Sequence, residues 1–239
     1  MALRKAATRL EYVTENAFTL DLVNTNKLLL EKLTGEGIPL SNVIYVSIGE
    51  AGSSSHAALN LIRDRALLQN LGCKFADGRS YDDLHDLTNF LGSGVIIYVD
   101  DFAGTGNQFC EEQEQLASYI VGTFSQFYLL HTACEEAIQE IDGNGVVPWP
   151  RTIHEKIARP LHRDSTNLSS EEKDCLFQLC LKIANGRTGS LGYGDLAVSI
   201  VFYQNSPDNV PCVFRGDTGQ ENFRGLVPRT TDLPKPSFV

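Results

Sequence analysis

Short apolar runs alternate along the chain with longer segments in which apolar residues recur at helical spacing. Val43–Ile48 and Val95–Val99 are almost entirely apolar, and Gln126–Thr132 has the apolar centre FYLL. Such unbroken runs are typical of strands that are buried on both faces of a parallel sheet. One helical segment extends to about Gln69, and another covers Gln108–Phe124. This alternation predicts an α/β fold in which helices flank a parallel sheet, with right-handed crossovers.

The segments outside these runs have weaker patterns. Residues 4–34 read as one long helix, which ends at the glycines of residues 35–37. Residues 73–89 are polar and lack clear periodicity, so we expect an irregular connection there. After residue 145 the regular alternation of strands and helices ends, because Pro148 and Pro150 break regular structure.

A further helix is predicted over residues 168–185, with Asp164 or Ser165 as a candidate cap. A further strand is predicted over residues 196–203, and a loop-rich tail follows it. We expect a single domain over residues 1–239, with a core at about 20–145 and a C-terminal elaboration at about 146–239.

The most informative stretch joins a predicted buried strand to a helix. Val95–Val99 leads into Asp100 and Asp101, and a loop of small residues then opens onto the helix. Glycines let a ligand approach the backbone, and the free N–H groups and dipole of a helix N-terminus favour an anion such as phosphate. The two carboxylates cannot bind that phosphate, but they can accept hydrogen bonds from hydroxyls on the same ligand. A ribose 5-phosphate carries both of these groups, a phosphate and vicinal hydroxyls.

This stretch resembles the phosphoribosyltransferase motif, over Val99-Asp-Asp-Phe-Ala-Gly-Thr-Gly-Asn-Gln108. The resemblance implies a type I phosphoribosyltransferase-like fold, in which Asp100 and Asp101 hold the ribose hydroxyls as the catalytic pair. The loop would hold the 5-phosphate through Gly104, Thr105, Gly106, Asn107 and Gln108. The motif usually ends in a hydroxyl residue, so Gln108 is a departure that puts one phosphate contact in question. The other interpretation is a generic Asp-rich turn between a strand and a helix.

A second small-residue loop follows the predicted strand at residues 43–48. Phosphoribosyltransferases place a diphosphate-binding loop after an early strand, and Gly52, Ser53, Ser54 and Ser55 resemble it. Serines before a helix are also good N-caps without any ligand. Glu50 would repel a diphosphate unless a divalent cation lay between them, so we expect Mg²⁺ to be bound through the ligand, with Glu50 as its one candidate protein contact.

The segment at residues 73–89 lies where such enzymes carry a mobile hood over the substrate. Lys74 and Arg79 are candidates to approach a diphosphate from there, whereas the acidic residues of 82–86 oppose that role. A solvated connection without any function is the other interpretation.

Composition restricts the class of protein. The 239 residues include 20 basic and 30 acidic side chains, for a net charge of −10. This charge argues against extensive direct binding to nucleic acid or membranes, since both need clustered Lys and Arg. The six cysteines are irregularly spaced and predict neither a zinc site nor a disulfide framework. No stretch looks like a signal peptide or a membrane span, so we expect a cytoplasmic protein.

Four short segments behind the ribose motif carry a narrower resemblance. They are His162–Ser165, Leu191–Asp195, Tyr203–Pro211 and Leu226–Arg229. In this order, they resemble the phosphoribosyltransferase-like (PRTase-CE) effector family of bacterial conflict and antiphage systems, which includes effectors encoded with retrons. The resemblance covers about residues 20–229, with Phe214-Arg215 where the family commonly has a Trp.

The resemblance leaves two classes of function open. The first is a toxic effector enzyme that acts on phosphoribosyl pyrophosphate or a nucleotide, either as a phosphoribosyltransferase or as a hydrolase of the N-glycosidic bond. The second is a non-catalytic regulatory module that binds phosphoribosyl compounds or nucleotides within a defence complex. As partners, the resemblance implies a reverse transcriptase with its RNA/DNA product, or another neighbouring defence protein. Aromatic residues of the C-terminal third, such as Phe202 and Phe214, either bind such a partner or cover the sheet.

Overall fold

A computed structural model describes residues 1–49, 53–185, 189–216 and 225–227. Contacts divide the chain into two compact units, one formed by Phe18–Ile153 and the other by Met1–Ala17 together with His154–Val239. The candidate site lies in the first of these units. The predicted single-domain organisation, in which the C-terminal elaboration packs on the core, stays a prediction.

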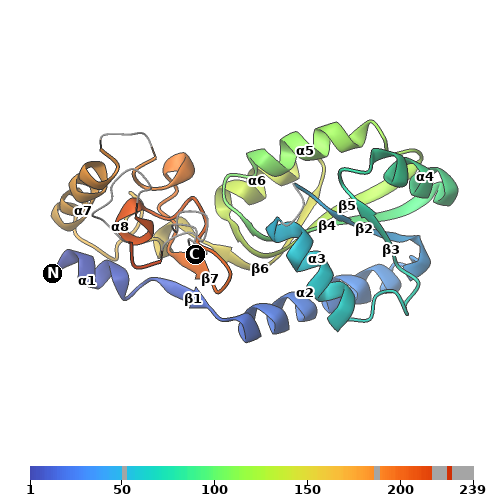
Figure 1. Ribbon diagram of the computed structural model, residues 1–239, viewed down its shortest axis with the longest axis horizontal. Helices are drawn as coiled ribbons and strands as arrows, with labels where there is room; N and C mark the ends of the chain where they lie inside the picture. The colour runs from blue at the N-terminus through green and yellow to red at the C-terminus, as the bar shows by residue number, and fades with distance from the viewer. Residues whose placement is uncertain (50–52, 186–188, 217–224, 228–239) are drawn as a thin grey trace, which may run out of the picture. The chain divides into compact units, whose positions relative to one another are not determined.

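The unit Phe18–Ile153 is built on a five-stranded sheet with the strand order β3-β2-β4-β5-β6 (Figure 1). The strands are β2 (Val43–Ser47), β3 (Lys74–Asp77), β4 (Ser93–Ala103), β5 (Thr123–Cys134) and β6 (Val147–His154). The pairs β2–β3, β2–β4 and β4–β5 are parallel. The predicted α/β architecture is therefore confirmed, with β4 paired on both sides at the centre of the sheet.

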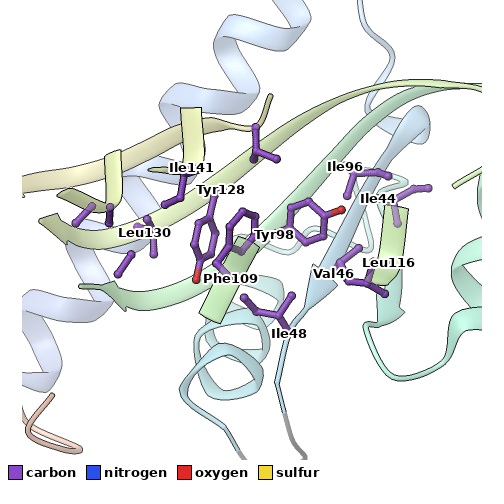
Figure 2. Packing of buried hydrophobic residues seen from close by; sticks show 14 of the residues in the cluster. Ile44, Val46, Ile48, Ile96, Tyr98, Phe109, Leu116, Tyr128, Leu130 and Ile141 are labelled. Carbon is purple, nitrogen blue, oxygen red and sulfur yellow. The ribbon is translucent and has the colours of Figure 1, made fainter. Parts of the chain in front are cut away.

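Helices cover both faces of this sheet (Figure 1). The helices α4 (Tyr81–Leu91), α5 (Asn107–Ala117) and α6 (Glu135–Gly143) share one core with it, while α2 (Glu15–Gly35) and α3 (Ser54–Arg65) lie on the other face. In the core that the sheet shares with α4, α5 and α6, the Phe109 ring of α5 stacks on Tyr128 of β5, with 3.8 Å between the ring centroids (Figure 2). The Phe109 and Tyr98 rings form a T-shaped pair with 5.3 Å between their centroids. This aromatic contact anchors the N-terminal half of α5, and with it the loop that precedes the helix, to the sheet.

The second unit contains both ends of the chain. Its elements are α1 (Ala2–Ala7), β1 (Glu11–Val13), α7 (Ser170–Ile183), β7 (Ile200–Phe202) and α8 (Cys212–Arg215), with short 3₁₀ turns at 156–158 and 193–195. The strand β1 pairs in parallel with β7. Among the described residues, no helix has the length and hydrophobicity that crossing a membrane requires. The cytoplasmic location stays a prediction.

Several sequence-based expectations for individual elements were wrong. The long helix expected at residues 4–34 is interrupted, because residues 11–13 find a strand partner that is almost 190 residues away along the chain. The expected irregular connection at 73–89 contains β3 and most of α4, and the break expected at Pro148–Pro150 is part of β6. The strand expected at 196–203 is regular only at Ile200–Phe202, because Asp195 and Ala197 adopt left-handed conformations. The cap of α7 is Ser169, in a capping box with Glu172, rather than Asp164 or Ser165.

A serine hydroxyl joins the carboxyl ends of the two central strands. The Ser55 side chain is 1% exposed; its Oγ accepts from the Ile48 N–H at 2.8 Å and donates to the Val99 carbonyl at 2.6 Å. These bonds tie the chain that leaves β2 to β4 at the start of α3. Without this hydroxyl the Ile48 N–H would lose the partner that the structure shows for it.

We expect Ser55→Ala to lower the free energy of unfolding by about 2 kcal/mol, since it leaves the buried Ile48 N–H unpaired. Chemical denaturation of the full chain measures this loss. The control is Ser118→Ala at the exposed end of α5, where the hydroxyl bonds only to Gln115 in its own helix. Equal stability of the two variants would contradict the structural role of Ser55.

Candidate functional site

The acidic pair lies near the carboxyl end of β4. Asp100 is half-buried and Asp101 is 8% exposed. The strand continues beyond them to Ala103, so the pair is held within the sheet, with Asp100 in register with Leu130 of β5. The sequence placed the end of the strand before the pair; strand pairing instead gives both carboxylates a fixed backbone.

Hydrogen bonds from three elements hold the carboxylate of Asp100. Its Oδ1 accepts from the Ser54 hydroxyl of α3 at 2.7 Å and from the Asp101 N–H at 2.8 Å. Its Oδ2 accepts from the Tyr128 hydroxyl of β5 at 3.2 Å. Burial raises the pKa of Asp100 well above its ordinary value, and the charge of Asp101 raises it further, while the Ser54 hydrogen bond opposes the shift.

The predicted phosphate loop lies between β4 and α5, as the sequence indicates. Gly104 and Thr105 are half-buried, and Gly106 precedes the helix with φ +86°. Gly106 offers no side-chain cap to α5, the Asn107 N–H donates to the Thr105 hydroxyl at 3.4 Å, and no acidic residue lies in the first turn of the helix. The N–H groups that follow Asn107 in the first turn of this helix suit an anion.

Gly106 also has a structural role. A Cβ at this position would lie 3.1 Å from Cβ of Glu140 and 3.3 Å from Cα of Ala137, both on α6. The glycine therefore permits close packing of the loop on α6 as well as its left-handed conformation. A bulky substitution here would disturb the fold together with any ligand, so it cannot test the phosphate site alone.

The three serines of the predicted diphosphate loop have different surroundings. The hydroxyl of Ser54 bonds to Asp100, and that of Ser55 bonds to the backbone of both central strands. The Ser53 hydroxyl donates to the Ile48 carbonyl at 3.1 Å and lies 3.0 Å from Nδ1 of His56. Gly52 and Glu50 lie outside the described residues. Of the described serines, Ser53 and Ser54 are therefore better suited to a ligand than Ser55.

His56 is a residue that the sequence analysis missed. Its Nε2 lies 3.1 Å from the Ser47 hydroxyl and 3.5 Å from a carboxylate oxygen of Asp77, at the end of β3. The imidazole thus connects Ser53 to the neighbouring strand. A histidine three residues after a loop serine was the available signal, but β3 had to be recognised before Asp77 could be placed beside it.

Arg79, a candidate diphosphate contact, is paired with Asp77. Its Nε donates to Oδ1 at 3.1 Å and its second guanidinium nitrogen to Oδ2 at 2.5 Å. The hydrogen bonds from Arg79 hold the pKa of the Asp77 carboxyl well below its usual range. The other candidate, Lys74, lies in β3 beside Ile44 of β2.

Glu112 of α5 is a second residue that the sequence analysis missed. Its Oε2 accepts from the Gly49 N–H at 2.5 Å, and its Oε1 accepts from Nε2 of Gln108 at 3.1 Å. Gly49 lies in the loop after β2, and Gln108, the last residue of the predicted 5-phosphate loop, lies in the first turn of α5. One carboxylate therefore connects the two predicted phosphate loops.

No group of three or more His, Cys, Asp or Glu side chains in the described part of the chain could hold a metal ion. The oxygens of Asp100 already accept hydrogen bonds from Ser54 and Tyr128. The binding of Mg²⁺ through phosphate oxygens of a ligand stays a prediction.

Comparison with known proteins places the chain in a family. None of the curated proteins compared with the chain matches it. Among solved structures, orotate phosphoribosyltransferase from Aeropyrum pernix shares 17% identity, over 58% of this chain and 72% of that one, with a TM-score of 0.37. A hypothetical protein from Neisseria gonorrhoeae with bound ppGpp shares 10% identity, over 61% and 84%, with a TM-score of 0.40. At these values the likenesses say nothing about ligand or activity.

The family model PRTase-CE matches residues 12–229. This span contains the acidic pair, both candidate loops and nearly all of the elements described above. The resemblance inferred from the sequence is thus confirmed, and the chain belongs to the PRTase-CE family.

Proposed function

We propose that this protein is an enzyme of the phosphoribosyltransferase type that acts on a phosphoribosyl or nucleotide ligand at the carboxyl ends of β2 and β4. The observation that carries the proposal is the Asp100 carboxylate, which Ser54, Tyr128 and the Asp101 N–H hold in β4, the strand that leads through the loop at residues 104–106 into α5. Ligands of open α/β sheets bind beyond the carboxyl ends of the strands.

In this proposal each group of residues has one task. Asp100 and Asp101 accept hydrogen bonds from the ribose 2- and 3-hydroxyls, and the N–H groups of residues 104–108 bind the 5-phosphate. Ser53 and Ser54 face the substituent on the anomeric carbon. When that substituent leaves with its bonding electron pair, the nearby carboxylates stabilise the positive charge that develops on the sugar ring. Mg²⁺, when bound, would neutralise a departing diphosphate.

Such a reaction needs no protein nucleophile, because rigid positioning and charge stabilisation lower its barrier. The acceptor can be a nucleobase, a group on a macromolecule, or water. With water and a nucleotide, the enzyme is a hydrolase of the N-glycosidic bond. A nucleotide and metabolite profile of cells that express the chain, beside an inactive variant, distinguishes these reactions. Ligand binding without any product would favour the non-catalytic regulatory module.

We also propose that the protein is a toxic effector of a retron-type antiphage system. The support is the ordered resemblance of segments in residues 162–229, and a cytoplasmic location fits this role. A reverse transcriptase with its RNA/DNA product, or another neighbouring protein, would restrain it. Phe202 and Phe214 are buried, so a partner would bind elsewhere than at these two rings. Growth and gel-filtration mass, measured with and without the neighbouring genes, test this role; unchanged toxicity and mass would reject it.

We expect the double change Asp100→Asn, Asp101→Asn to weaken the binding of ribose 5-phosphate at least about 100-fold, because hydrogen bonds to charged groups are worth roughly 1.5–3 kcal/mol each. The fold should persist, since both amides retain the volume of the carboxyl groups. Calorimetry measures the binding, and circular dichroism checks the fold. The matched control is Asp82→Asn, Asp83→Asn on exposed positions of α4. Equal affinity of the wild type and the Asp100–Asp101 variant would reject the ribose site.

A pH dependence of stability follows from the raised pKa of Asp100. Between the ordinary aspartate pKa and this higher value, the native state binds more protons than the unfolded state. The free energy of unfolding contributed by this group is therefore highest at low pH and falls as the pH rises through the folded pKa.

We expect Asp100→Asn to raise the melting temperature at pH 8 and to lose this advantage towards pH 4, because the substitution removes the buried charge. Melting curves across this pH range measure the effect, with Asp82→Asn as the exposed control. If the melting temperatures of the wild type and Asp100→Asn changed with pH in parallel, the raised pKa of Asp100 would be contradicted.

A further inference from the structure

The first residue of the loop after β2 already has an anionic partner from within the protein. The Gly49 N–H donates to Oε2 of Glu112 at 2.5 Å, from a left-handed conformation with φ +78°. A backbone N–H at this place is the type of group that binds a phosphate oxygen. The carboxylate of Glu112 therefore occupies a position that a diphosphate on the anomeric carbon would otherwise use.

The described surroundings of the Glu112 carboxylate supply hydrogen bonds and no opposite charge. Its other oxygen accepts from Gln108 at 3.1 Å, one helical turn earlier on α5. In the described part of the chain, no Lys, Arg or His forms a salt bridge with Glu112. Two neutral donors, the Gly49 N–H and the Gln108 amide, therefore orient the carboxylate.

Other carboxylates reach the same region. Burial raises the pKa of the Tyr128 hydroxyl, and the charges of Asp100, Asp101 and Glu112 raise it further. Glu112 thus lies close enough to act electrostatically on the residue that donates to Asp100. A ligand that brings a diphosphate to this place would add its charge to three carboxylates.

We propose that Glu112 determines ligand specificity by selecting against a diphosphate on the anomeric carbon. The inference rests on the proposed function and narrows its ligand class to nucleoside 5-monophosphates, in preference to phosphoribosyl pyrophosphate. A nucleobase is neutral and carries N–H donors, so it suits a site in which a carboxylate replaces an anion. The 5-phosphate is bound separately, at the N-terminus of α5.

Gln108 acts as a positioning residue in this arrangement. It stands where the phosphoribosyltransferase motif usually has a hydroxyl residue, and its amide group points to Glu112 rather than to the loop backbone. The glutamine at position 108 and the Glu112 carboxylate at Gly49 therefore belong to one hydrogen-bonded arrangement.

The test compares the wild type with Glu112→Gln, which retains an acceptor for the Gly49 N–H and removes the charge. Calorimetry on the full chain, with and without Mg²⁺, uses inorganic diphosphate, phosphoribosyl pyrophosphate, ribose 5-phosphate and adenosine 5-monophosphate. The control is Glu111→Gln, the same charge change at an exposed position of α5.

Without Mg²⁺, we expect Glu112→Gln to bind diphosphate and phosphoribosyl pyrophosphate about tenfold more tightly than the wild type, since one close charge repulsion is removed. Binding of ribose 5-phosphate should change less than about twofold, because its phosphate lies on the other loop. The wild type should prefer adenosine 5-monophosphate to phosphoribosyl pyrophosphate. Glu111→Gln should match the wild type.

The outcomes separate the two proposals. Unchanged diphosphate affinity in Glu112→Gln, with ribose 5-phosphate bound by both proteins, overturns the role of Glu112 and leaves the phosphoribosyl site intact. The same tightening in Glu111→Gln shows a general charge effect and also overturns it. Failure of every phosphate ligand to bind either protein overturns the specificity inference together with the proposed function.

Discussion

The partial burial of the Asp100 carboxylate, where β4 pairs with β5, is the constraint on which the candidate site depends. A charge removed from water is costly unless hydrogen bonds replace its hydration. Ser54 supplies one bond from the start of α3, and Tyr128 supplies another from β5. These donors fix the beginning of one helix and the position of a neighbouring strand relative to β4. The carboxylate thus organises the same elements that would surround a ligand.

This arrangement separates structural from ligand-facing groups along one short segment. The Ser55 hydroxyl joins the chain after β2 to β4, and the preceding residue, Ser54, donates to Asp100. His56 contacts the Ser53 hydroxyl through one ring nitrogen and Asp77 of β3 through the other. Rigid support of this kind is what a site needs when it works by positioning and by charge rather than through a nucleophile.

The sequence predicts the centre of this fold well and its periphery poorly. The apolar run of residues 95–99 and the small-residue loop after it are local signals, because burial on both faces and close backbone approach each require particular residue types. The strands β1 and β3 form instead because they pair with strands that are distant in sequence. The residues of such short strands do not reveal these partners. The roles of Glu112 and His56 were missed for the same reason, since each acts across elements whose proximity only the fold creates.

Negative charge is unusually concentrated at the site of a protein that already carries a net charge of −10. In the proposed site, backbone N–H groups and helix dipoles would attract an anionic ligand, since Arg79, one of the two candidate cations, is paired with Asp77. Such dipoles act over a short range and at particular positions, whereas carboxylates repel anions from all sides. The balance favours a ligand with a single phosphate placed at α5 over one that is charged at both ends. Glu112 contributes to this preference, because its carboxylate accepts the hydrogen bond of the Gly49 N–H, a backbone donor that a second phosphate group would need.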